Sequence, residues 1–454
     1  MLKKNQELLL SIDGMSAEGT GIGRFEGQAV FVSGTAIGDS VSCRIIKAKK
    51  NYAVGKIIEI AEPSPDRIPS DCPVSDRCGG CCFRHVSYPA ELQYKQKKVE
   101  DALQRIGHIS CPVHPVLESP VTEHYRNKAQ YPVCKNPSTG APEIGFYAFH
   151  SHRIIPCTDC RLQPVLFSKL LSVICGWAER FSVPAYDEAT GKGLLRHIYL
   201  RQGQISGEVM VCLVVTRPAV PHTEELGKAL RQCSKVKTIL LNINKERTNV
   251  ILGQETCLLF GDGYIKDQLL GKTFSLSPRA FYQVNHDGCE LLYRKAAEYA
   301  ALSKEDILLD LYCGVGTIGL TMADKCKQVY GVEIIPEAVE DAKRNAKENG
   351  IQNATFFCGD AAAAAEKLRK EQVHADVIIV DPPRKGLSPN LIQTVTTFSP
   401  KRIVYVSCDP ATLARDLALF KEQGYFVSEA TPVDLFPRTA HVETVALLLK
   451  GKEE

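Results

Sequence analysis

Long apolar runs are missing from this sequence of 454 residues, and so is a strong net charge of either sign. Because no stretch approaches the roughly 20 apolar residues of a membrane-spanning helix, we expect no membrane association. The first residues, MLKKNQELLL, contain only a short apolar run and no site typical of signal-peptide cleavage. A formal net charge of +3 gives no general electrostatic field, so nucleic-acid binding would have to rest on local basic patches. These absences predict a cytoplasmic protein.

Cysteine, in contrast, is abundant, with 18 residues. In a reducing cytoplasm, such residues are free thiols or metal ligands more often than disulfides. Charged residues make up 24% of the chain and hydrophobic residues 44%, which is typical of a folded protein, and the length suggests about two to four domains.

The first 61 residues have the pattern of a small β-barrel. Strand-like runs at 7–12, 28–32, 40–46 and 52–60 are separated by turn signals. A basic turn with Lys49, Lys50 and neighbouring Tyr52 could hold phosphates and stack a base, although a solvated loop would look the same. The glycine-rich segment EGTGIGRFEGQAVFV resembles the TRAM domain, an OB-like RNA-binding module attached to RNA-modifying enzymes.

A cysteine cluster follows in DCPVSDRCGGCCFRH, where Cys72, Cys78 and Cys81 have the spacing C-x5-C-x2-C. Three thiolates close in sequence can bind one soft metal centre, and either Cys157 or Cys160 could supply a fourth ligand. Both zinc and a 4Fe-4S cluster accept four cysteines, so the spacing leaves the metal open. The radical-enzyme pattern C-x3-C-x2-C does not occur here, which argues against reductive radical chemistry.

The middle of the chain combines basic and aromatic residues in the runs YRNKAQYPV and IGFYAFHSH. Such a combination can bind phosphates and stack bases, but it also occurs in an ordinary half-buried sheet. Further strands and helices up to about residue 275 indicate an α+β region without an evident catalytic constellation.

Alternating strands and helices after residue 276 predict a doubly wound α/β domain. The run ILLDLYCGVGTIGL predicts a strand, a glycine turn and a helix, and the next strand ends at Glu333, which could accept hydrogen bonds from ribose hydroxyls. The loop DLYCGVGT replaces G-x-G-x-x-G, and VIIVDPPRKG ends the fourth strand at Asp381. These two features favour S-adenosylmethionine over a dinucleotide. Asp360, after the third strand, could contact adenine or cap a helix.

The run RIVYVSCDPATLARDL predicts a strand that delivers Cys408 to the same sheet edge, and Glu443 precedes the last strand. By position alone, Cys408 could be an ordinary buried thiol and Glu443 a surface residue. Carbon methylation of a pyrimidine needs both groups, because C5 of uracil is a poor nucleophile until a thiolate adds to C6, and a base must then remove the C5 proton. We therefore predict Cys408 as nucleophile and Glu443 as proton acceptor.

Together, motifs such as CGGCCFRHVSY, FYQVN, DPPRKG, SCDPATLARDL and HVETVALL resemble the RNA uracil-C5-methyltransferase family, over essentially the whole chain. The resemblance implies a class I S-adenosylmethionine-dependent methyltransferase fold at the carboxyl terminus. It also implies a central α+β domain with a 4Fe-4S cluster, leaving Cys157 as a spare thiol. The implied ligands of the cluster are Cys72, Cys78, Cys81 and Cys160. The implied contacts to the methyl donor are Gln283, Tyr312, Glu333 and Asp381.

The same resemblance suggests a division into a barrel (1–61), a central domain (62–90 and 121–275) and a methyltransferase domain (91–120 and 276–454). Because transfer-RNA members of the family are expected to lack the barrel and the cluster, the resemblance favours 23S ribosomal RNA as substrate, methylated by a monomer. Transfer RNA remains the alternative substrate. The DPPR loop also resembles that of enzymes that methylate exocyclic nitrogens, and a non-catalytic RNA-binding iron-sulfur protein is a further alternative.

Overall fold

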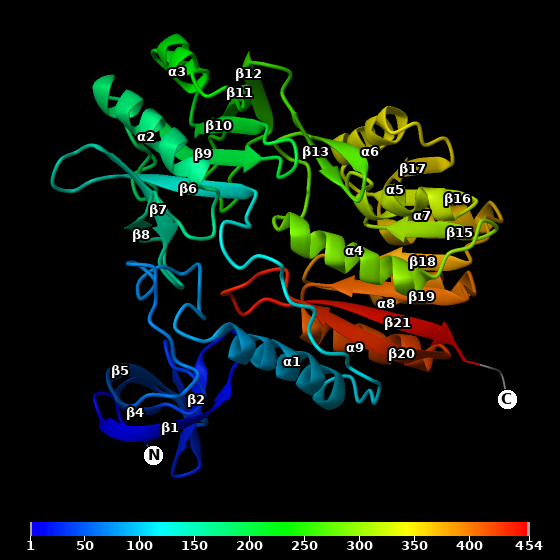
Figure 1. Ribbon diagram of the computed structural model, residues 1–454, viewed down its shortest axis with the longest axis horizontal. Coiled ribbons are helices and arrows are strands. Elements are labelled where there is room, and N and C mark those ends of the chain that lie inside the picture. Colours follow the sequence, from blue (N-terminus) through cyan, green and yellow to red (C-terminus); the bar gives the residue numbers. More distant parts are fainter. Residues whose placement is uncertain (1, 452–454) are drawn as a thin grey trace.

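The amino-terminal strands close into a five-stranded barrel in the computed structural model, which describes residues 2–451 (Figure 1). Its strands are β1 (Glu7–Met15), β2 (Gly21–Phe25), β3 (Gln28–Val32), β4 (Ser40–Ala48) and β5 (Tyr52–Glu62). The barrel closes because β4 pairs with both β1 and β5. Strand β2 lies in a segment that the sequence predicted as a turn. Gly23 allows it to pair closely, because a Cβ at this position would lie 2.4 Å from the Ser11 carbonyl oxygen.

The central unit is a seven-stranded sheet in the order β12-β11-β10-β9-β6-β7-β8. Its strands are β6 (Lys128–Lys135), β7 (Pro142–Tyr147), β8 (Ile154–Pro156), β9 (Leu195–Gln202), β10 (Val209–Val215), β11 (Val236–Ile243) and β12 (Glu255–Phe260). Helices α2 (Val165–Arg180) and α3 (Thr223–Leu230) cover one face. The opposite face packs against the last unit of the chain, so β10 is buried along its whole length.

The last unit is a second seven-stranded sheet in the order β17-β16-β15-β18-β19-β21-β20. Its parallel strands are β15 (Ile307–Leu311), β16 (Gln328–Glu333), β17 (Ala354–Cys358), β18 (Val377–Val380) and β19 (Arg402–Ser407), and its antiparallel pair is β20 (Tyr425–Val433) and β21 (Glu443–Lys450). This doubly wound sheet and the amino-terminal barrel confirm the predicted fold class.

Helices cover both faces of this sheet. One face carries α4 (His286–Ala300), α5 (Thr317–Met322), the short 3-10 helix Ala323–Lys325 and α6 (Pro336–Glu348). The other carries α1 (Tyr88–Arg105), α7 (Ala361–Lys370), α8 (Pro389–Thr397) and α9 (Pro410–Glu422). No helix within residues 2–451 is both long and apolar enough to cross a bilayer.

Two segments connect the doubly wound sheet with other parts of the chain. Helix α1 follows the cysteine cluster but packs on α9, where Val99 and Leu103 share a core with Leu417 (Figure 1). The hairpin of β13 (Ile265–Leu269) and β14 (Lys272–Leu276) shares its core with α4 and β15 and contacts α6. The hairpin therefore joins the doubly wound sheet to the central one, because Met210 and Cys212 of β10 share the same core.

Candidate active site and cysteine-rich loop

The strand register brings four predicted site residues to one edge of the doubly wound sheet. Leu311 of β15 pairs with Val380 of β18, so Tyr312 and Asp381 follow at neighbouring strand ends. Likewise, Ser407 of β19 pairs with Thr444 of β21, which places Cys408 and Glu443 at facing positions. The carboxyl ends of parallel strands are the usual place for a ligand in such folds.

The glycine loop after β15 has a tight left-handed course, with φ of 66° at Tyr312, 55° at Gly314 and 83° at Gly316. The Gly314 N–H donates to Glu333 Oε2 at 3.1 Å, and the Ile335 N–H donates to Glu333 Oε1 at 2.9 Å. A fixed carboxylate at the end of the second strand can accept from ribose hydroxyls, while a glycine backbone lets the ligand approach closely. This geometry fits the adenosine part of S-adenosylmethionine.

Asp360 caps helix α7: its Oδ1 accepts hydrogen bonds from the N–H groups of Ala362 and Ala363. Of the two roles that the sequence suggested for Asp360, the structure shows the helix cap. A contact with adenine stays a prediction. Gln283 is buried just before α4, and its carbonyl accepts a hydrogen bond from Asn127 Nδ2 at 2.8 Å. This bond ties the motif FYQVN to the motif YRNKAQYPV.

Cys408 and Glu443 carry strongly shifted pKa values. Burial raises the pKa of Glu443, which is 3% exposed, to about 8, and nearby Asp381 acts in the same direction. Burial also raises the pKa of half-buried Cys408 to about 11, with Glu443 and Asp381 adding to the shift. At neutral pH, this site therefore holds a thiol and a predominantly protonated carboxyl group.

One cation opposes these shifts. Arg384, in the loop after Asp381, lowers the pKa of both Cys408 and Glu443. Its Nη2 lies 3.4 Å from His441 Nε2, and the pKa of His441 falls to about 4, through burial first and Arg384 second. His441 is therefore a neutral imidazole. The motifs DPPRKG and HVETVALL contained Arg384 and His441, but spacing alone gave neither residue a role.

The cysteine-rich loop, residues 71–85, lies between the barrel and the central sheet (Figure 1). Cys72, Cys78 and Cys157 pack beside Val74 and Ile155. Among residues 2–451, no group of three or more histidine, cysteine, aspartate or glutamate side chains converges closely enough to hold a metal ion. The comparisons below do not reveal an iron-sulfur cluster either.

Two buried donors nevertheless fit a sulfur-rich group at this place. Arg84 is 4% exposed, and its Nη1 donates to Asp71 and Glu123. Its Nε and Nη2 have no oxygen or nitrogen acceptor in the described part of the chain, and the Cys81 sulfur lies beside the guanidinium. Its charge lowers the pKa of Cys81, although burial raises that pKa to about 12 overall. The Tyr131 hydroxyl is also buried without a described partner, and the thiols of Cys160 and Cys157 lie near it. Unpaired buried donors are costly, so an acceptor such as a cluster sulfur would satisfy both.

Comparison with known proteins gives a match along most of the chain. Residues 87–451 match the family described as tRNA (Uracil-5-)-methyltransferase, and residues 2–58 match the TRAM domain, which confirms the predicted barrel. An "Uncharacterized RNA methyltransferase" of Clostridium tetani is 43% identical over 98% of this chain and 97% of its own length. A protein of Halalkalibacterium halodurans with a similar name is 42% identical over 98% of both chains.

Among solved structures, the Pyrococcus abyssi tRNA (uracil-54, C5)-methyltransferase in complex with S-adenosyl-L-homocysteine is 26% identical, with a TM-score of 0.77. The match covers 97% of this chain and 100% of that one. The family model and the solved structure are both described as uracil-5-methyltransferases, and the relatives are described as RNA methyltransferases. This chain therefore belongs to the family of S-adenosylmethionine-dependent RNA uracil-5-methyltransferases.

Proposed function

We propose that this enzyme methylates C5 of a specific uridine in 23S ribosomal RNA, with Cys408 as nucleophile and Glu443 as proton acceptor. The observation that carries this proposal is that these two residues face each other at the sheet edge from which the glycine loop after β15 begins. Family membership favours this chemistry over exocyclic-nitrogen methylation and over a non-catalytic iron-sulfur protein.

The reaction needs a thiolate because uracil C5 is not nucleophilic enough by itself. In the proposed first step, the Cys408 thiol loses its proton to solvent and the thiolate sulfur bonds to C6, while the electron pair of the C5=C6 bond moves toward O4 to give an enolate. S-adenosylmethionine would supply a methyl group on a positively charged sulfur; C5 of the enolate bonds to that methyl group, and the methyl–sulfur bond breaks to leave neutral S-adenosylhomocysteine. Glu443 then removes the C5 proton, the C5=C6 bond forms again, and the bond from Cys408 to C6 breaks.

Arg384 assists both the first and the last step of the reaction, because its charge favours the deprotonated forms of Cys408 and Glu443. A site closed by RNA would exclude water and strengthen that interaction. We propose that the methyl donor is held by Gln283, Tyr312, Glu333 and Asp381, with Asp360 at the adenine.

The cysteine-rich loop is proposed to hold a 4Fe-4S cluster through Cys72, Cys78, Cys81 and Cys160. The unpaired donors of Arg84 and Tyr131 support this assignment, since cluster sulfurs accept hydrogen bonds. The cluster would shape the RNA-binding surface between the barrel (1–61) and the central domain (62–90 and 121–275), and the methyltransferase domain (91–120 and 276–454) would carry the reaction.

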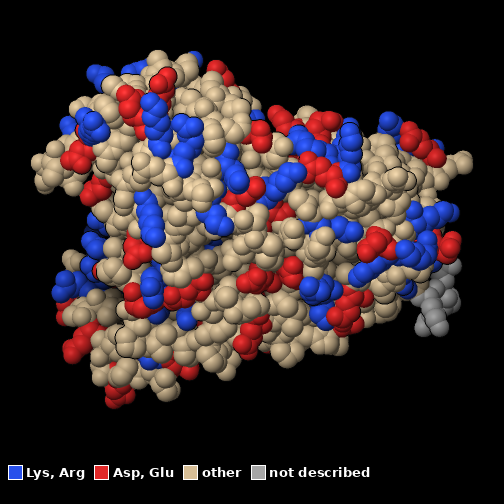
Figure 2. Space-filling model, turned by 45° about the horizontal axis from the view of Figure 1, so that its top comes forward, with Lys and Arg blue, Asp and Glu red and all other residues tan. Residues whose placement is uncertain are grey.

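Transfer RNA is an alternative to 23S ribosomal RNA as the substrate. The Pyrococcus abyssi protein is a tRNA enzyme, yet its match covers 97% of this chain and so extends into the barrel. A barrel therefore does not separate the two substrates as the sequence argument assumed, and transfer RNA is the second candidate. Figure 2 shows basic and acidic side chains interspersed on one face, so local contacts would have to select the RNA. We expect a monomer that acts on cytoplasmic RNA.

The test uses 23S ribosomal RNA and transfer RNA that both lack 5-methyluridine. Each RNA is incubated with the protein and methyl-labelled donor, and digested products are identified by mass spectrometry. We expect 5-methyluridine in 23S ribosomal RNA. Product in transfer RNA alone would overturn the substrate, and methyl groups on an exocyclic nitrogen would overturn the chemistry.

A further inference from the structure

A buried polar face of α1 contacts residues 434–442, here called the base loop because Glu443 follows it directly. Lys95 of α1 is 1% exposed, and its Nζ donates hydrogen bonds to Asp434 Oδ1 at 2.6 Å and to the Phe436 carbonyl oxygen at 3.2 Å. The base loop is therefore attached to α1 at its first and third residues.

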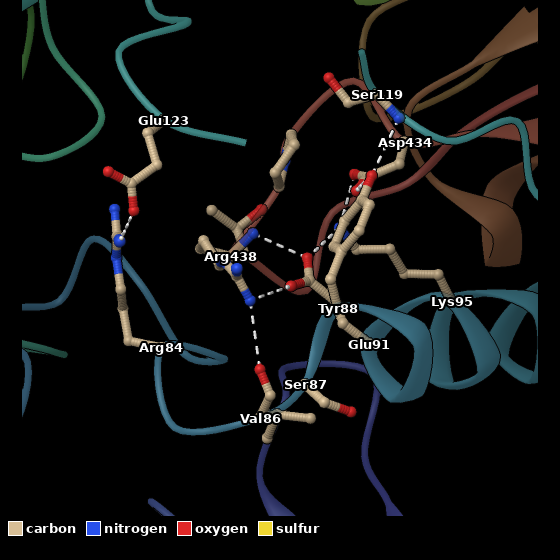
Figure 3. A network of polar contacts seen from close by, with 12 residues as sticks. Arg84, Val86, Ser87, Tyr88, Glu91, Lys95, Ser119, Glu123, Asp434 and Arg438 are labelled. Atoms are coloured by element: carbon tan, nitrogen blue, oxygen red, sulfur yellow. Dashed lines mark hydrogen bonds and ion pairs between the residues drawn. The ribbon is translucent and has the colours of Figure 1, made fainter. Parts of the chain in front are cut away.

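The middle of the base loop is held by contacts of Arg438, which Figure 3 shows. Its backbone is left-handed, with φ of 69°. Its N–H donates to Glu91 Oε1 at 2.7 Å, and its Nη1 donates to the Val86 carbonyl oxygen at 3.1 Å. A left-handed conformation is unfavourable for arginine, so outside contacts must maintain it. Figure 3 shows Glu91 and Val86 on the α1 side of this contact.

The cysteine-rich loop and the far part of α1 complete the attachment. The N–H groups of Cys82 and Phe83 donate to the Arg438 carbonyl oxygen at 3.0 and 3.2 Å, and Lys98 Nζ donates to the Ala440 carbonyl oxygen at 2.8 Å. Groups outside the base loop thus bind every second residue from 434 to 440.

The charges in this network are balanced, with Glu91 and Asp434 opposite Lys95 and Arg438, and all four side chains are largely buried. Buried ion networks of this kind add little stability over apolar packing, but they can select one arrangement of the chain. Val433 precedes the base loop and pairs with Glu443. The network therefore selects the arrangement of the segment that runs from Val433 to its strand partner Glu443.

We propose that Arg438 is a positioning residue for Glu443, and that through Arg438 the α1 helix and the cysteine-rich loop set the orientation of the base for removal of the C5 proton. This role rests on the proposed function. The contacts of α1 and the cysteine-rich loop with Arg438 would then serve one reaction step. In that step the C5–H bond breaks, the proton moves to Glu443, the C5=C6 bond forms again and the Cys408–C6 bond breaks.

The test compares Arg438→Gln with the double variant Glu91→Gln/Arg438→Gln, using full-length protein and RNA that carries hydrogen or deuterium at C5 of uridine. The single variant leaves one buried acid without its partner, so we expect a lower melting temperature. The double variant again has equal numbers of buried acids and bases, so we expect its melting temperature to recover.

Proton removal should remain slow in both variants. We expect kcat to fall on the order of 10²-fold with little change in KM. The hydrogen/deuterium isotope effect on the rate of 5-methyluridine formation should increase, because removal of the C5 hydrogen becomes slower. The covalent protein–RNA adduct should accumulate on a denaturing gel. A purely structural defect would reduce the amount of active protein and leave the isotope effect and the adduct fraction unchanged.

Arg402→Gln is the matched control, because Arg402 also joins a backbone carbonyl, that of Ala300 at 2.8 Å, and an acid, Asp306 at 3.6 Å. It lies at the opposite end of β19 from Cys408, so we expect the wild-type isotope effect and adduct fraction.

A wild-type isotope effect and adduct fraction in the folded double variant would overturn the positioning role. If wild-type protein released no C5 hydrogen from 23S ribosomal RNA or transfer RNA and formed no adduct, the proposed function would fail and the positioning role with it. The two failures are therefore distinguishable by the behaviour of the wild type.

Discussion

Cys408 and Glu443 occupy facing positions at the ends of two antiparallel strands, one residue beyond the pair formed by Ser407 and Thr444. We predict that Glu443→Gln traps the covalent adduct, because the thiolate can still add to C6 but the C5 proton stays in place. A slow band of protein and RNA should appear on a denaturing gel. Cys408→Ala should form no adduct and no 5-methyluridine, whereas Cys257→Ala on β12 should behave as wild type.

The raised pKa of Glu443 also predicts an effect on stability. Between the ordinary value of 4.5 and the folded value of about 8, the folded state binds more protons than the unfolded state, so the free energy of unfolding falls as pH rises. Glu443→Gln removes this penalty. We expect the variant to melt above wild type at pH 8, by about 2 °C or more, and at the same temperature near pH 4. An equal gain at both pH values would contradict the buried, protonated carboxyl group.

Activity should rise with pH, since both the thiolate of Cys408 and the carboxylate of Glu443 are needed. Arg384 lowers the pKa of both groups, so Arg384→Gln should move the rate profile to higher pH and lose more activity at pH 7 than at pH 9. The control is Lys385→Gln, an exposed neighbour that should leave the profile in place. The measurement is the single-turnover rate of methylation across this range. A uniform loss for Arg384→Gln would indicate an RNA contact instead.

The cysteine assignment can be tested with two neighbouring thiols. Cys160→Ala should remove iron and sulfide from anaerobically purified protein, whereas Cys157→Ala should keep about four iron atoms per chain. Both thiols lie near Tyr131, so the variants are matched in position. Iron retained by Cys160→Ala and lost by Cys157→Ala would reverse the assignment, and zinc in the wild type would replace the cluster.

The barrel should bind RNA through the turn between β4 and β5. Lys49 and Lys50 are exposed there, and the Tyr52 ring is 38% exposed at the start of β5. We expect Lys49→Ala/Lys50→Ala to raise KM without changing kcat, and to reduce the slope of log affinity against log salt by about 2. Lys343→Ala/Lys347→Ala on α6, far from the barrel in Figure 1, is the control. An unchanged salt slope would exclude this turn from the RNA interface.

Many residues of the candidate site could be predicted from the local sequence pattern. Strands that end at Glu333, Asp381 and Cys408 have continuous apolar runs followed by polar residues, and parallel strands in one sheet present such ends at a common edge. The glycine turn and the family motifs then indicated the methyl donor and the reaction. The TRAM barrel followed likewise, although β2 was hidden in a glycine-rich segment that has the composition of a turn.

The sequence by itself determined the fold class, the family and the residues at the strand ends, because these depend on periodicity and on short motifs. The family resemblance assigned residues 91–120 to the methyltransferase domain, but only the tertiary structure showed that α1 packs on α9 there. Only the tertiary structure also connected Glu91 and Lys95 to the base loop, as the separation of 347 residues between Glu91 and Arg438 illustrates. Such contacts leave no periodic signal. The pKa of Glu443 was equally out of reach, since it depends on burial and on Asp381, which the chain brings together only when it folds.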